Sequence, residues 1–64
     1  MFYEIGLSII NLDCIISIYT RDLTNDYVIM FETPTGAKYI KHFNLCKEER
    51  DREYINLKTK LCND

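Results

Sequence analysis

The sequence predicts an α+β fold, in which a small antiparallel sheet of three to four strands is followed by one C-terminal helix. Short runs of apolar and β-branched residues recur between residues 5 and 43, separated by turn-forming residues. The chain from residue 45 to residue 61 contains no Gly, no Pro and few β-branched residues, which favours a helix. Strands first and one helix last is an order typical of the α+β class, and we expect a single domain that spans residues 1–64.

The N-terminal part of the chain is expected to contain two short strands joined by a bend. The first strand covers about residues 5–10, and the second covers residues 14–20, where isoleucines alternate with Ser and Tyr. The bend lies at residues 11–13, because Asn and Asp side chains bond to their own backbone in turns. Residues 21–26 are expected to form a polar connection to the next strand.

The clearest element of the sequence is a β-hairpin. It has a strand over residues 27–32, a turn over residues 33–36 and a return strand over residues 37–43. Pro34 presets the backbone dihedral φ in this turn, and Gly36 tolerates a positive φ. The hairpin therefore supplies two neighbouring strands of the expected sheet.

A single amphipathic helix is expected at about residues 45–61. Asn44 is a good N-cap residue, because its side chain can accept a hydrogen bond from the first helical turn. The apolar stripe of the helix lies in its second half, at Tyr54, Leu57 and Leu61. The first two turns are charged on nearly all sides and are expected to face water. They contain three residues that could instead face a partner protein: Glu48, Glu49 and Arg52.

Both faces of the predicted hairpin carry apolar side chains. In the strand over residues 27–32, four consecutive apolar residues leave no polar face. One helix can cover only one face of a small sheet, and we assign it to the face with the aromatic residues, which has more apolar area and fewer charges. The opposite face then has an apolar centre and a polar rim, as interfaces do, and its expected contact residues are Val28, Met30, Ile40 and His42.

Two alternatives remain for the cover of this second face. The N-terminal segment could fold across it, or another protein could cover it. A second copy of the chain is the first partner to expect, because symmetric dimers are the commonest oligomers and 64 residues form only a thin core. We therefore expect a homodimer.

The composition argues against several other classes of function. Eight basic and ten acidic residues give a net charge of −2, which is too balanced for a dedicated nucleic-acid-binding protein. The lone histidine, His42, has no recognisable catalytic partner in the sequence, and no cofactor motif is present. Neither a signal peptide nor a membrane-spanning run is found. We expect a cytoplasmic, non-enzymatic protein that binds no membrane, no metal and no cofactor.

The three cysteines, Cys14, Cys46 and Cys62, stand far apart in the sequence. They form no CxxC pair of the kind that zinc sites use. We interpret them as reduced, small, buried apolar side chains, with an intermolecular disulfide as the alternative. Cys46 lies in the first turn of the expected helix, where the helix dipole favours a thiolate, but the structural interpretation is preferred there as well.

The chain resembles small proteins encoded by phages and prophages of low-GC Gram-positive bacteria. The resemblance lies in three segments: IINLDCIISIYT, YVIMFETPTGAKYIKHF and KEERDREYINLKTKL. Members of that group with assigned roles are often inhibitors of bacterial antiviral systems, including anti-CRISPR proteins, and many act as homodimers. The resemblance implies a non-enzymatic inhibitor that binds a host defence protein, and it carries over no site residues. The alternative function is a small homodimeric accessory or regulatory protein that binds a nucleotide or a nucleic acid.

Overall fold

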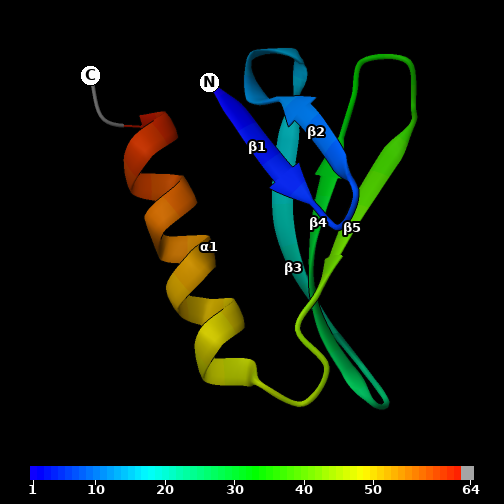
Figure 1. Cartoon of the computed structure of the whole chain (residues 1–64), viewed down its shortest axis with the longest axis vertical. Helices are drawn as coiled ribbons and strands as arrows, with labels where there is room; N and C mark the ends of the chain where they lie inside the picture. Colours follow the sequence, from blue (N-terminus) through cyan, green and yellow to red (C-terminus); the bar gives the residue numbers. More distant parts are fainter. Residues whose placement is uncertain (63–64) are drawn as a thin grey trace.

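Two antiparallel sheets followed by one helix make up the computed structural model, which describes residues 1–62 (Figure 1). The predicted α+β class with a C-terminal helix is confirmed, although the strands divide between two sheets. Within the described residues, no helix has the length and apolar character needed to cross a membrane. In the first sheet, β1 (Phe2–Ile5) pairs with β2 (Ser8–Asn11). The second sheet has the order β3 (Ser17–Leu23), β4 (Asp26–Glu32) and β5 (Lys38–His42), and the helix is α1 (Lys47–Cys62).

The first sheet is a hairpin where the sequence predicts a single strand. The run expected as a strand over residues 5–10 contains the turn between β1 and β2, in which Ile5 pairs with Ser8. Gly6 has a φ of +57°, a left-handed conformation that costs glycine little because it lacks a Cβ atom. The apolar run therefore contains a chain reversal at Gly6, which the hydrophobic pattern does not reveal.

A short 3-10 helix connects the two sheets. It is η1 (Leu12–Cys14), and the Asn11 side chain accepts a hydrogen bond of 3.0 Å from Asp13 N at its start. The bend predicted at this point is confirmed. The strand that follows, β3, begins at Ser17, three residues later than expected, because the 3-10 turn occupies the expected start.

The second sheet contains the predicted hairpin. β4 and β5 pair across the expected turn at residues 33–36, in which Gly36 has a φ of +89°. β3 ends three residues later than expected and β4 begins one residue earlier, so they pair as far as Leu23 and Asp26 and leave only a two-residue connection. Most of the polar stretch expected as a loop at residues 21–26 therefore belongs to strands, because cross-strand pairing outweighs its local preference for a loop.

Helix α1 begins at Lys47, and its N-cap is Cys46 rather than Asn44. The Cys46 carbonyl accepts the first helical hydrogen bond, from Arg50 N at 3.1 Å. Asn44 has a φ of +54°, a left-handed conformation that Asn adopts more readily than most residues. Its carbonyl accepts from Tyr27 N at 2.8 Å. Asn44 therefore anchors the chain to β4, and the helix starts after it.

The core lies on one face of the second sheet, which we call the inner face. Ile29 and Phe31 of β4 are fully buried there and belong to one cluster with Leu57 of α1. The N-terminal segment covers the same face, because Ile10 and Leu12 belong to that cluster. Figure 1 shows the β1–β2 hairpin in front of the second sheet and α1 running alongside. The assignment of the helix to the aromatic face is confirmed, whereas the alternative that the N-terminal segment covers the opposite face is wrong.

Candidate functional site

The opposite face of the second sheet, which we call the outer face, carries the predicted interface residues. Directly paired residues on neighbouring strands lie on the same face of a sheet. The register of β3, β4 and β5 places three apolar residues in one row across the sheet: Tyr19, Met30 and Ile40. Two flanking rows carry the charges of this face: Arg21, Val28 and His42 in one, and Ser17, Glu32 and Lys38 in the other.

The centre of the outer face is already shielded within the chain. Val28 is 0% exposed and Met30 is 6% exposed, yet neither belongs to the core cluster of the inner face. Their shielding therefore comes from contacts outside that cluster. Ile40 remains 39% exposed, and His42 is exposed as well. The structure corrects the expectation of an open apolar centre: Val28 and Met30 form a floor, and Ile40 and His42 form accessible surface.

His42 is held at the edge of the outer face by Asp26. Its Nδ1 lies 2.5 Å from Asp26 Oδ2, and Asp26 Oδ1 accepts from the backbone N–H of Asn44 at 2.8 Å. The hydrogen bond with His42, assisted by the Asn44 N–H, holds the pKa of Asp26 below its ordinary value of 3.8. The His42 side chain is nevertheless 56% exposed. The contact therefore fixes the orientation of the imidazole and leaves it accessible, which suits polar recognition at the rim of an interface.

The charged helix residues predicted to face a partner lie on another side of the molecule. Glu48, Glu49 and Arg52 are all exposed on α1. Because α1 packs on the inner face, these side chains and the outer face lie on opposite sides of the second sheet. The structure therefore does not bring the two predicted sets of residues together.

One charged residue in the first turns of α1 is buried, contrary to expectation. Arg50 is 3% exposed, and its guanidinium donates to the carbonyl oxygens of Arg21 at 3.1 Å and Val28 at 3.4 Å. It also forms an ion pair of 2.9 Å with Asp22. The expectation that the first two turns face water is wrong at this position. The sequence contained a signal, because Arg50 lies seven residues before the buried Leu57 and so on the same side of the helix.

A second polar cluster, which we call the latch, consists of Tyr3, Lys41 and Glu53. The Tyr3 hydroxyl donates to Glu53 Oε2 at 2.6 Å and accepts from Lys41 Nζ at 2.8 Å. Burial, followed by the neighbouring Glu53, raises the pKa of Tyr3 above its ordinary value of 10.0. The hydrogen bond from Tyr3 in turn lowers the pKa of Glu53 below its ordinary value of 4.5. The latch joins β1, β5 and α1, so its contacts hold the hairpin and the helix on the inner face.

The cysteines do not occupy the buried positions that the sequence predicts. Cys14, Cys46 and Cys62 are all exposed, free thiols. Cys14 ends η1, Cys46 precedes α1 and Cys62 ends it, so each lies at the boundary of a helix. Among residues 1–62, no three His, Cys, Asp or Glu side chains gather in an arrangement that could hold a metal ion.

Comparison with known proteins finds no matching protein-family model, no matching curated protein and no matching solved structure.

Proposed function

We propose that this chain is a non-enzymatic binding protein that inhibits a bacterial antiviral defence protein by direct contact through the outer face. The observation that carries the proposal is the apolar row of Tyr19, Met30 and Ile40, which lies between two rows that contain charged residues. Met30 is shielded, so the accessible apolar area of this row comes from Tyr19 and Ile40, and accessible apolar area inside a polar rim is the usual arrangement of a protein interface. The binding mode is supported by this geometry, and the target class is supported by the resemblance to small phage proteins.

The outer face suits a partner that places an apolar side chain over its floor. Val28 and Met30 are already removed from water, so a partner has little hydration to displace above them. Ile40 stands beside Met30 in register and still has exposed area to bury. Arg21 and Lys38 flank the apolar row on the two edge strands, and they favour acidic groups on the partner.

We also propose that a second copy of the chain occupies this face when no target is bound, and we expect the homodimer to be weak. Full burial of an aliphatic side chain contributes roughly 1.5–3 kcal/mol. Ile40 is only 39% exposed, and scaling by that fraction gives roughly 1–2 kcal/mol for two copies of Ile40. Association itself costs several kcal/mol. Contacts between the polar rims must supply the difference, so the dimer should form only at high protein concentration.

The test compares Ile40→Glu with the matched variant Ile55→Glu. Both replace an exposed isoleucine with the same charged residue, but Ile55 lies on α1, away from the outer face, and is 60% exposed. Phage infection is measured in a panel of bacterial strains that each carry one defence system. We expect the unaltered chain and Ile55→Glu to protect phage against one system, and Ile40→Glu to lose that protection while its circular dichroism spectrum is unchanged.

Each other outcome changes the proposal in a defined way. Equal protection by Ile40→Glu would move the contact away from the outer face. Failure to protect phage anywhere in a broad panel would contradict the target class. A nucleotide released from heat-denatured protein would favour the alternative of a nucleotide-binding regulator. Light scattering tests the dimer separately, and Ile40→Glu should return its mass to the 7.6 kDa of the monomer.

A further inference from the structure

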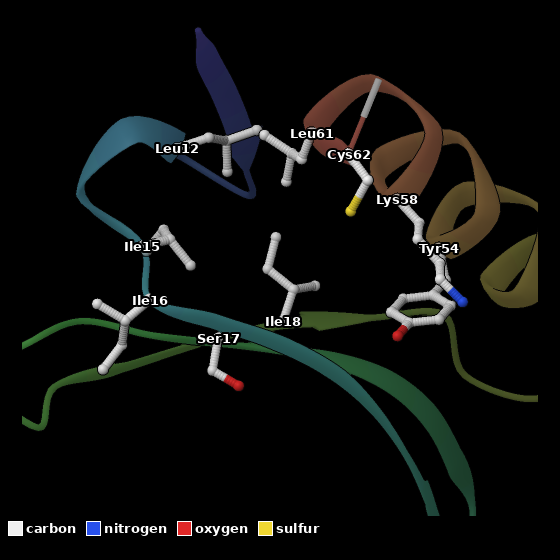
Figure 2. A pocket seen from close by; sticks show the side chains of 9 residues that line it. All are labelled: Leu12, Ile15, Ile16, Ser17, Ile18, Tyr54, Lys58, Leu61 and Cys62. Atoms are coloured by element: carbon white, nitrogen blue, oxygen red, sulfur yellow. The ribbon is translucent and has the colours of Figure 1, made fainter. Parts of the chain in front are cut away.

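An apolar groove opens on the helix side of the molecule, between the start of β3 and the C-terminal half of α1 (Figure 2). Its volume is about 400 Å³, which lies within the range of small-molecule binding sites. Aliphatic side chains supply most of the walls, from Leu12, Ile15 and Ile18 on one side and Leu61 on the other. Most of the groove lies on the inner side of the second sheet, and Ser17 is the outer-face residue that borders it among residues 1–62.

The groove is the open end of the core. Leu12 belongs to the core cluster, and Ile15, Ile18 and Tyr54 pack against that cluster. Figure 2 shows the Leu12 and Leu61 side chains reaching toward each other from η1 and α1, with Ile18 pointing into the space between the strand and the helix. Leu61 is still 38% exposed, so the end of the helix does not close the gap. An apolar ligand here would extend the core without displacing any element.

Among residues 1–62, Lys58 is the one charged residue that lines the groove. Its Nζ lies over the ring of Tyr54, 6.0 Å from the ring centroid. Within residues 1–62, no carboxylate oxygen lies within 4.0 Å of this ammonium group. The groove therefore combines aliphatic walls with a single positive charge, in a chain whose net charge is −2.

We propose that the groove binds a small anionic amphiphile of the fatty-acid class, with its carboxylate at Lys58 and its hydrocarbon chain between Ile15, Ile18 and Leu61. Aliphatic walls favour a hydrocarbon chain because both surfaces leave water. The ammonium group favours an anionic head group. Nucleotides and sugars fit poorly, since the aliphatic walls would leave their many polar atoms without hydrogen-bond partners. This inference does not depend on the proposed function of the outer face.

To test this, the isotope-labelled protein is titrated with decanoate at concentrations below the critical micelle concentration of decanoate. Amide chemical shifts are measured in NMR spectra at each concentration. We expect saturable shifts at the groove residues and little change on the outer face. Decylammonium, which has the same chain and the opposite charge, should bind at least about tenfold more weakly. Equal binding of the two amphiphiles, shifts centred outside the groove, or no saturable binding of decanoate would each overturn the proposal.

Two lysine variants separate a local charge from the charge of the whole protein. Lys58→Glu and Lys60→Glu make the same change two residues apart on α1, but only Lys58 lines the groove. We expect Lys58→Glu to weaken decanoate binding about tenfold and Lys60→Glu to change it less than about twofold. Equal weakening by both variants would indicate a general charge effect and would overturn the assignment of Lys58.

Discussion

The two faces of β4 are buried to nearly the same extent, but different parts of the chain bury them. Ile29 and Phe31 on the inner face are covered by distant segments of the chain, which include Leu57 of α1. Val28 and Met30 on the outer face are 0% and 6% exposed, although the helix and the hairpin lie on the other side of the sheet. The inner face is buried by the packing of α1 and the N-terminal segment on the sheet, whereas Val28 and Met30 are buried by contacts outside that core cluster.

This difference distinguishes residues that stabilise the whole fold from residues that mainly shape the outer surface. A side chain that contacts several elements loses all those contacts when it is truncated, and a cavity remains. A side chain shielded only by its neighbours in the sheet leaves a depression that water or a rearranged neighbour can fill. Equal burial therefore does not imply equal contributions to stability, and substitutions on the two faces can test this.

Phe31→Ala should have the largest effect. Phe31 is fully buried at the centre of the inner face, with the Tyr3 ring centroid 5.5 Å from its own. Removal of a buried phenylalanine side chain lowers the free energy of unfolding by about 3–5 kcal/mol. A core this small supplies about as much in total, so we expect the variant to be largely unfolded. Urea denaturation followed by circular dichroism measures the effect, and a loss below about 1 kcal/mol would contradict the role given to the inner face.

Met30→Ala should cost less, about 2 kcal/mol, at the lower end of the range for buried methionines. Met30 forms the floor of the outer face and takes no part in the core cluster, so the core should remain intact. The same denaturation experiment gives the loss of stability, and NMR shifts of the inner-face residues should stay unchanged. A loss as large as that of Phe31→Ala would show that the outer face belongs to the core after all.

Tyr3→Phe should cost about 1 kcal/mol, because the latch loses the hydroxyl that bonds Glu53 and Lys41. The pKa of Tyr3 is raised in the folded chain, so only the unfolded chain ionises this group as the pH rises past 10.0. The unaltered protein should therefore lose stability above that pH, and Tyr3→Phe should lose less. Denaturation curves at neutral and alkaline pH measure both effects, with Tyr39→Phe as the control. If Tyr3→Phe and Tyr39→Phe lost the same amount of stability at alkaline pH, this role of Tyr3 would be ruled out.

Asp26→Asn should have the smallest effect, confined to the edge of the outer face. The pKa of Asp26 lies below 3.8 in the folded chain because of its hydrogen bond with His42. A lowered carboxyl pKa stabilises the fold above the ordinary pKa, and this stabilisation is lost as the pH falls through the folded value. The variant should therefore be slightly less stable at neutral pH and less sensitive to acid between about pH 5 and pH 2. An unchanged acid profile would contradict a stabilising Asp26–His42 contact.

The sequence was sufficient to predict those features that depend on neighbouring residues. The α+β class, the turn at residues 33–36 and the face of β4 that the helix covers all follow from local composition and from alternation along a strand. The face shared by Val28, Met30, Ile40 and His42 follows from the same alternation. Their exposure could not be predicted, because it depends on side chains contributed by the neighbouring strands.

The features that the sequence could not predict arise from contacts between distant residues. The N-terminal hairpin docks on the inner face through Tyr3, which bonds Lys41 38 positions later and Glu53 50 positions later. No local pattern marks such a contact. The groove is also invisible in the sequence, since it exists only where the end of α1 leaves the start of β3 uncovered. Arg50 is a different case, because its spacing from Leu57 is a local signal for a buried position, although the charge pattern of the helix led to the opposite prediction.

The strand topology has a consequence for how quickly this chain folds. Every strand pairs with a strand next to it in the sequence, β1 with β2, β3 with β4 and β4 with β5. Bringing such segments together costs little loop-closure entropy, and an isolated hairpin forms in roughly 1–10 µs. Within residues 1–62, only the docking of the N-terminal hairpin and the helix joins distant segments. We expect a fast-folding chain that reaches its folded form soon after synthesis and leaves its apolar core residues open to aggregation only briefly.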